Sequence, residues 1–184
     1  PLQPAPYGLI QERIRSSLYA LVVQAILWNQ TRGQTARPVL FTLLATYPTP
    51  LALSTASLPH LTSILQPIGL HNVRATRLIA LAHAWLLAPP SRDRRYRKLH
   101  YPSRGCGSDV RSGEVLRLGD ERQGWEIAHL PGVGTYALDS YRIFYRDELR
   151  GVGGEEGVEP EWKRVVSGDK ELKLYLGWRW GREG

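Results

Sequence analysis

The chain has 184 residues, 42% of them hydrophobic, which is enough to bury the core of one domain and also fits two helical lobes around a cleft. Its net charge of +7 favours an anionic partner, although a basic protein without such a partner fits the charge about as well. The single cysteine, Cys106, excludes an intramolecular disulfide, a four-cysteine iron–sulfur cluster and a cysteine-rich zinc site, and it agrees with a reducing compartment.

The chain carries no recognisable targeting or membrane signal. No run of about 18 apolar residues occurs, so we predict no membrane span. The N-terminus lacks the charged-then-apolar pattern of a signal peptide, and residues 1–8 are rich in proline and predict an extended arm. Because the chain contains no methionine, we expect it to be a fragment or a processed form.

The first half of the chain has the apolar spacing of amphipathic helices. Ser17 is a candidate N-cap for the first of them, because its hydroxyl can accept a hydrogen bond from a free backbone N–H. Pro38 is expected in the first turn of the second, where a missing N–H costs little. The predicted helices cover residues 18–28, 34–47, 51–56, 58–65 and 73–87.

Residues 88–124 interrupt this pattern with a basic, aperiodic segment. Six cations accompany one acid, Asp93, in its first part: Arg92, Arg94, Arg95, Arg97, Lys98 and Arg104. We interpret the segment as a long, mobile insertion that follows a nucleic-acid backbone. A solvated, disordered insertion fits the composition equally well.

A glycine turn over 131–134 joins two predicted helices, a short one over 125–130 and a longer one with Thr135 as a plausible N-cap. Gly132 and Gly134 permit positive φ without steric cost. A glycine turn that opens a helix leaves backbone N–H groups unpaired, and these suit a phosphate oxygen.

The C-terminal part predicts a Gly- and Glu-rich loop over 150–168 and a last helix over 169–180. Asp169 lies near the N-terminus of that helix, where the helix dipole and free N–H groups favour the ionised carboxylate. Asp139 and Asp147 are competing carboxylates that spacing alone does not separate from it, although Asp139 is more simply a surface or inter-helix partner. No strand-like alternation persists, so the predicted fold class is all-α.

The sequence of residues 130–134, followed by a helix and an aspartate further on, resembles the helix-hairpin-helix DNA glycosylase superfamily (HhH-GPD). Residues 134–144 resemble more closely the thymine-DNA glycosylase domain that is elsewhere fused to a methyl-CpG-binding domain. The other similar segments are 9–12, 27–33, 67–70, 73–75 and 169–180. The resemblance implies one domain over 9–180, with lobes of approximately 25–130 and of 9–24 with 131–180, and with insertions at 88–124 and 150–168.

The resemblance implies base excision repair of double-stranded DNA: hydrolysis of the N-glycosidic bond of thymine or uracil mispaired with guanine, after base flipping. The family takes its catalytic carboxylate from the start of the last helix, which here is Asp169. Family members that act as lyases carry a nucleophilic lysine where this chain has Tyr136, so we expect a monofunctional hydrolase. We expect a monomer in the nucleus, with no cofactor and no metal.

Further roles are implied for side chains outside the reaction centre. Gln11 and Tyr136 would recognise the flipped pyrimidine, while Gln30 enters the vacated stack and Leu70 lies beside the orphaned guanine. The backbone of the hairpin would bind a DNA phosphate through Gly132, Val133, Gly134 and Thr135.

Two positions depart from the family. Gln30 stands where the fused form commonly has arginine, and Glu171 follows Lys170 where the family places lysine second after the aspartate. A nearby glutamate could raise the pKa of Asp169 or weaken DNA binding. Two alternatives therefore stay open: a non-catalytic helix-hairpin-helix DNA-binding module, and a glycosylase for another damaged base, against which the missing cluster cysteines and Tyr136 argue.

Overall fold

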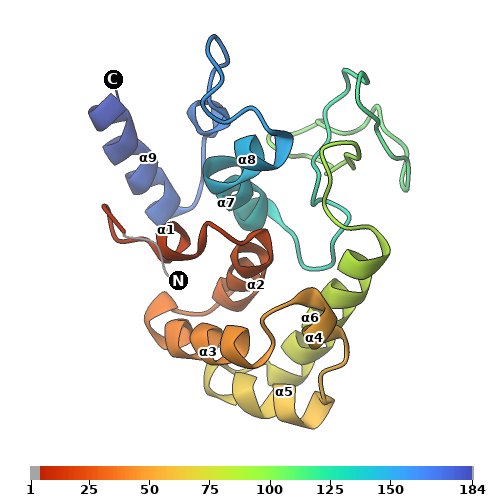
Figure 1. Cartoon of the computed structure of the whole chain (residues 1–184), viewed down its shortest axis with the longest axis vertical. Coiled ribbons are helices and arrows are strands. Elements are labelled where there is room, and N and C mark those ends of the chain that lie inside the picture. The colour runs from red at the N-terminus through yellow and green to blue at the C-terminus, as the bar shows by residue number, and fades with distance from the viewer. Residues whose placement is uncertain (1–4, 184) are drawn as a thin grey trace.

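The computed structural model describes residues 5–183 and confirms the all-α prediction (Figure 1). Over this range there are nine α-helices and two short 3-10 helices, and the only β pairing consists of isolated bridges. The helices are α1 (Ile10–Ile14), α2 (Leu18–Trp28), α3 (Gly33–Thr46), α4 (Pro50–Ser54), α5 (Leu58–Leu65), α6 (His71–Leu87), α7 (Thr135–Phe144), α8 (Arg146–Arg150) and α9 (Lys170–Glu183), with η1 (Gln66–Ile68) and η2 (Glu161–Arg164). None of the helices within 5–183 combines the length and apolar character needed to cross a bilayer. The predicted arm over 1–8 lies partly outside the described residues, and Pro6 and Tyr7 lie in a bend.

Helix α2 lies between two groups of helices. In Figure 1, α3 to α6 gather below it and α7 to α9 above it. Every residue of α2 from Leu18 to Leu27 is buried, which is typical of a helix that is covered on all sides. The predicted N-cap is confirmed, because the Ser17 hydroxyl accepts a hydrogen bond from the Ala20 N–H at 3.1 Å. The end of α2 therefore lies where the two groups meet.

The position of Pro38 differs from the prediction. Helix α3 begins at Gly33, one residue earlier than expected, so Pro38 lies in its second turn and inside the helix. A proline there cannot donate to the Gln34 carbonyl. Both residues are exposed, so water can satisfy that carbonyl, and the helix continues to Thr46.

The short helix predicted over 125–130 does not form. This stretch is a series of tight turns, in which Ala128 N–H donates to the Trp125 carbonyl and Leu130 N–H to the Ile127 carbonyl. Trp125 is drawn out of a helix because its backbone pairs with Tyr96 in an isolated bridge. The second helix of the hairpin forms as expected, and Phe144 is its last residue.

The N-cap of α7 is Gly134 and not Thr135, which is the first residue of the helix. Gly134 is extended, with φ of −111°, and no side chain caps the helix. Of the two glycines in the turn, Gly132 alone uses the positive φ that the sequence allows, at 85°.

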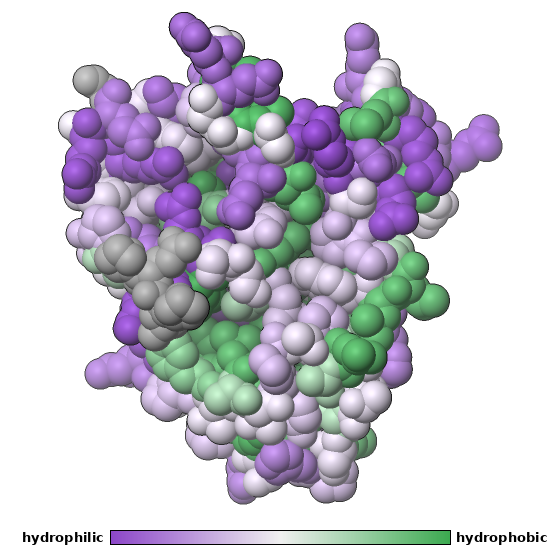
Figure 2. Space-filling model, viewed as in Figure 1, coloured by the Kyte–Doolittle hydropathy of each residue, from purple (hydrophilic) through white to green (hydrophobic). Residues whose placement is uncertain are grey.

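The basic segment over 88–124 is folded and not a loose loop. The Arg95 guanidinium donates to the carbonyls of Arg122 (2.6 Å), Arg117 (3.3 Å) and Asp120, and its backbone pairs with Leu116. Several guanidinium groups of this segment therefore bind its own carbonyls, which leaves them less free to follow a nucleic-acid backbone than the composition suggests. Hydrophilic residues nevertheless dominate the upper part of the face in Figure 2, where this segment and the loop after α8 lie.

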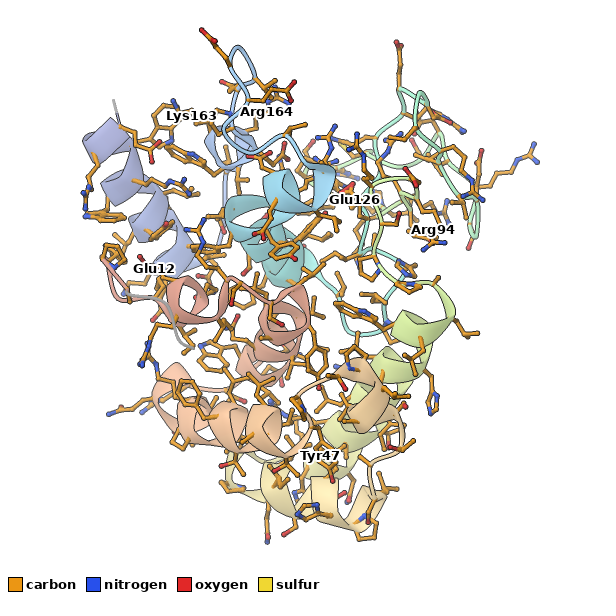
Figure 3. The ribbon with its side chains drawn as sticks, viewed as in Figure 1. Glu12, Tyr47, Arg94, Glu126, Lys163 and Arg164 are labelled. Atoms are coloured by element: carbon orange, nitrogen blue, oxygen red, sulfur yellow. The ribbon has the colours of Figure 1, made fainter. Side chains whose placement is uncertain are left out.

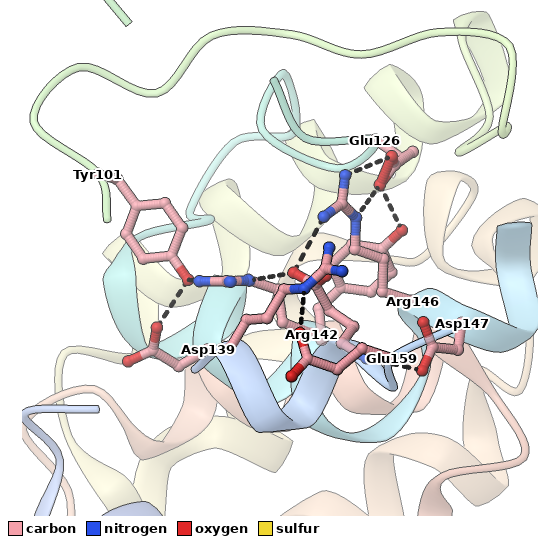
Figure 4. Close-up of polar contacts among 10 residues, drawn as sticks. Tyr101, Glu126, Asp139, Arg142, Arg146, Asp147 and Glu159 are labelled. Carbon is pink, nitrogen blue, oxygen red and sulfur yellow. Dashed lines mark hydrogen bonds and ion pairs between the residues drawn. The ribbon is translucent and has the colours of Figure 1, made fainter. Parts of the chain in front are cut away.

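A buried cluster of opposite charges joins the hairpin to the loop before α9 (Figure 4). Arg142 pairs with Glu161 at 2.6 Å, and Arg146 pairs with Glu161 at 3.0 Å and with Glu126 at 2.8 Å. Both guanidinium groups lie 4.6 Å from the centre of the Trp125 ring. This cluster fixes α7 and α8 relative to the C-terminal segment that carries Asp169.

Candidate active site

A cavity of about 540 Å³ lies where the end of α2, the hairpin and the start of α9 meet. Positively and negatively charged side chains both line this cavity. At the glycines of the hairpin, the backbone itself forms part of the wall. The wall includes Trp28 at the end of α2, Gln30 and Arg32 after it, Gly132, Gly134, Thr135 and Tyr136 from the hairpin, and Asp169 and Glu171 from the start of α9.

Two hydrogen bonds hold the Tyr136 side chain in the wall of this cavity. Its hydroxyl oxygen accepts hydrogen bonds from Gln11 Nε2 at 2.8 Å and from Gln24 Nε2 at 3.0 Å. Burial raises the pKa of the Tyr136 phenol to about 12; the Gln24 hydrogen bond lowers it in part, and the nearby Asp169 charge raises it. Tyr136 is therefore a neutral phenol at physiological pH, and it keeps its own O–H as a donor.

Gln24 was missed by the sequence reasoning. It lies in the middle of α2, its side chain is fully buried, and its Oε1 has no hydrogen-bond partner among the described residues. The signal was available, because a glutamine inside an otherwise apolar buried helix needs a polar partner.

Gln11 lies behind Tyr136 and is not part of the cavity wall. It is 2% exposed and belongs to the short helix α1. Glu12 fixes that helix, because its Oε1 accepts hydrogen bonds from the N–H groups of Gly8 at 2.8 Å and Leu9 at 2.9 Å. In this arrangement Gln11 orients Tyr136, and its direct contact with a base stays a prediction.

Asp169 immediately precedes α9, as the sequence predicts, and lies in the cavity wall. Its Oδ1 accepts a hydrogen bond from Leu172 N–H at 2.9 Å, which caps the helix. Its own N–H donates to the Ser167 hydroxyl at 3.1 Å. Its Oδ2 makes no hydrogen bond to the described part of the chain, so one carboxylate oxygen is free to act in the cavity.

The two competing carboxylates do not reach the cavity wall. Asp147 accepts a hydrogen bond from Glu161 N–H at 3.0 Å and serves the C-terminal loop. Asp139 was expected to be a surface or inter-helix partner; it is 3% exposed, which excludes the surface role, and it is a buried partner of Tyr101 and Ser167, while Arg142 pairs with Glu161. Burial raises the pKa of Asp139 above its ordinary value, although those two hydrogen bonds oppose the shift.

Gln30 and Leu70 lie in two neighbouring turns that Arg74 connects. Gln30 is exposed and lines the cavity, whereas Leu70 is 59% exposed and lies outside its wall. The buried Arg74 guanidinium donates to the carbonyls of Leu27 at 2.8 Å and Asn29 at 2.9 Å, and to the Thr31 hydroxyl at 2.6 Å. The sequence reasoning missed Arg74, although it directly precedes Ala75 on the apolar face of the helix.

The hairpin offers fewer free amides than predicted. Val133 is buried, and its N–H donates to the Leu130 carbonyl at 3.2 Å. The N–H groups of Gly132, Gly134 and Thr135 have no backbone partner within residues 5–183, so these three are left to bind a phosphate. The Val133 carbonyl accepts a hydrogen bond from Lys98 Nζ at 3.1 Å, which ties the basic segment to the hairpin.

Most of the chain matches a known protein family. The model of the family described as HhH-GPD superfamily base excision DNA repair protein matches residues 23–159. A solved structure, that of a thermostable thymine-DNA glycosylase, is similar at 18% sequence identity with a TM-score of 0.47. The similarity covers 71% of this chain and 48% of that one, so this chain spans about half the length of that protein.

Proposed function

Since this chain belongs to the HhH-GPD superfamily of base excision DNA repair proteins, we propose that it is a monofunctional DNA glycosylase acting on thymine or uracil mispaired with guanine. The observation that carries the proposal is the position of Asp169: among the three candidate carboxylates, it alone lies in the cavity wall, beside Tyr136. The choice of thymine or uracil rests on the resemblance of residues 134–144 and 169–180 described above.

The reaction begins when the mispaired nucleotide is flipped out of the duplex, at a cost of a few kcal/mol that is lower for a mismatch. The cavity receives the flipped nucleotide. The free Oδ2 of Asp169 stabilises the positive charge that develops on the sugar and orients or deprotonates the attacking water. One carboxylate suffices because the departing pyrimidine is itself a tolerable anion.

Tyr136 binds the base as a neutral hydrogen-bond donor. Gln11 and Gln24 occupy the acceptor side of its oxygen, so the phenolic O–H is left for the pyrimidine. A phenol cannot form the Schiff base through which a lysine cleaves the backbone. The product is therefore an abasic site in an intact strand.

Residues in and around the cavity wall hold the DNA. Gln30 fills the space that the flipped base leaves, and Leu70 lies beside the unpaired guanine. The free amides of Gly132, Gly134 and Thr135 bind a phosphate and set the position of the protein along the strand without reading its sequence.

A cleavage assay on labelled duplexes tests the proposal. Wild-type protein should release the base from a duplex with one G·T or G·U pair, so that hot alkali cuts that strand while omission of alkali leaves it intact. Asp169→Asn should abolish the cut, whereas the matched control Asp147→Asn, which alters a carboxylate outside the cavity wall, should retain it. No base release by the wild type, or equal release by Asp169→Asn, would overturn the proposal.

One observation favours a second candidate, a DNA-binding module without chemistry. Glu171 lies in the cavity wall where the family places lysine, so the residues around Asp169 depart from the family's catalytic pattern. Such a module binds duplex DNA with a strong salt dependence and releases no base. The same assay, read together with binding at two salt concentrations, separates the two functions.

A further inference from the structure

Ser167 connects the candidate catalytic residue to a buried aspartate. Its hydroxyl donates to Asp139 Oδ2 at 2.9 Å and accepts from Asp169 N–H at 3.1 Å. A carboxylate can only accept and an N–H can only donate, so both hydrogen bonds have a defined direction.

The other oxygen of Asp139 is held by the basic segment. Tyr101, which is 3% exposed, donates its hydroxyl hydrogen to Asp139 Oδ1 at 2.6 Å (Figure 4). The Tyr101 oxygen in turn accepts from Arg142 Nη1 at 3.3 Å. Both oxygens of Asp139 are thus occupied, and a continuous series of hydrogen bonds runs from Tyr101 through Asp139 and Ser167 to Asp169.

The loop before α9 depends on this contact. Val165 is buried, but Val166 is 93% exposed and Gly168 has no side chain. Between Val165 and Asp169, Ser167 is therefore the one residue whose side chain is buried in the protein. Glycine also allows many backbone conformations, so a hydrogen bond beside it restricts the backbone that leads into Asp169.

We propose that Tyr101, Asp139 and Ser167 are positioning residues for base excision, because they fix the backbone at Asp169 and thereby direct its Oδ2 into the cavity. The inference rests on the proposed catalytic role of Asp169. Under this proposal the segment over 88–124 contributes to the reaction centre, because it supplies Tyr101. A displacement of about 1 Å at a reacting group can lower a rate about a hundredfold.

Four variants of the full chain test this inference, with DNA affinity and single-turnover excision from a G·U duplex measured for each. Ser167→Ala should lower the excision rate about ten- to a hundredfold while the Kd for the duplex stays within about twofold of the wild type. Ser167→Thr retains the hydroxyl and should recover most of the rate. Tyr101→Phe, which leaves Ser167 in place, should lower the rate less than Ser167→Ala.

Tyr47→Phe is the matched control. Tyr47 is a buried tyrosine in the lower group of helices, and its hydroxyl lies 2.9 Å from His60 Nδ1 (Figure 3). Loss of the Tyr47 hydroxyl should lower the free energy of unfolding by about as much as Tyr101→Phe does, and it should leave the excision rate unchanged.

The outcomes distinguish the two levels of the argument. An inactive wild-type protein would overturn the proposed function and this inference with it. An active wild type with full excision by Ser167→Ala would overturn this inference alone. So would a loss of rate that Ser167→Thr does not recover and that follows DNA affinity or melting temperature, because that result assigns the series of bonds to folding only.

Discussion

Gln30 and Leu70 both have left-handed backbone conformations, with φ of 56° and 48°, in the two turns that Arg74 holds together. Positive φ is uncommon outside glycine and costs on the order of 1–3 kcal/mol at such a residue. These are the two positions expected to enter the DNA. Strain is therefore stored in the two turns for which we propose contact with the duplex, and the contacts of Arg74 offset it.

Arg74→Ala should therefore loosen one of these turns and impair base flipping. Three acceptors lose a charged donor, so we expect the free energy of unfolding to fall by about 2–4 kcal/mol. Discrimination between a G·U duplex and a fully paired duplex should weaken as well. Arg74→Lys keeps the charge without the planar fork and should recover only part of either loss. Denaturant unfolding and duplex titrations measure both effects, and unchanged discrimination in Arg74→Ala would contradict the role.

Tyr136→Phe should remove the shared acceptor of two buried amides. Gln11 and Gln24 would each lose a partner, and an unsatisfied buried group costs about 1–3 kcal/mol. Excision should fall because the donor to the base is lost, while backbone cleavage without alkali stays absent. Chemical denaturation and the alkali assay give the two readings. Retained excision by Tyr136→Phe would show that the hydroxyl does not bind the base.

The pH dependence should show no contribution from Tyr136 over the physiological range. Its phenol has a pKa of about 12, so it is neutral and able to donate until the pH approaches that value. An ordinary tyrosine loses its proton near pH about 10. A difference titration of tyrosinate absorbance between wild type and Tyr136→Phe should reveal no group that ionises below pH about 11. A Tyr136 signal near pH about 10 would mean that the buried arrangement is absent in solution.

Local chemistry explains what the sequence predicts correctly. Ser17 and Asp169 cap helices through hydrogen bonds to residues within one turn, so short-range patterns suffice to find both. The stretch over 125–130 was misassigned because its backbone pairs with Tyr96, a contact between distant residues. Arg95 looked like a free surface cation for a similar reason, since its carbonyl partners lie more than twenty residues further along the chain.

The candidate site shows the same division. Asp169 and Tyr136 are found from a family pattern, whereas Gln24 and Ser167 matter through contacts with residues far from them in sequence. Asp139 was expected to be a surface or inter-helix partner because it has a helical i,i+3 neighbour, Arg142. In the structure Arg142 pairs with Glu161 instead, a contact that no spacing rule predicts.

Gly132→Ala should weaken the binding of DNA by the hairpin. At φ of 85° an alanine is strained, and its Cβ would lie 3.0 Å from Ile26 Cδ1 and 3.1 Å from Arg77 Cδ. We expect a loss of about 1–2 kcal/mol in stability and weaker binding to every duplex, whatever its sequence. Gly134→Ala is the control, because φ is −111° there and no atom lies within 4 Å of the added Cβ. Equal effects of the two changes on melting temperature would contradict the argument.

Glu161→Gln should make the free energy of unfolding depend less on pH in the acid range and should lower it at neutral pH. Burial would raise the pKa of Glu161, but the charges of Arg146 and Arg142 outweigh burial and hold it below its ordinary value. A lowered folded pKa stabilises the protein above the unfolded value of about 4.3, and this contribution is lost as the pH falls through the folded value. Without it, the curve of unfolding free energy against pH should be flatter below pH about 4.3.

At pH about 7 the same change should lower the free energy of unfolding by about 3 kcal/mol, because two buried guanidinium groups lose an ionised partner. Glu159→Gln is the matched control. Glu159 pairs with Arg164 at 2.9 Å, but both side chains are 55% exposed, so screening by water should limit its effect to below about 1 kcal/mol. Urea unfolding of both variants across the acid range measures the difference. Parallel curves for wild type and Glu161→Gln would mean that the carboxyl of Glu161 does not titrate with the fold.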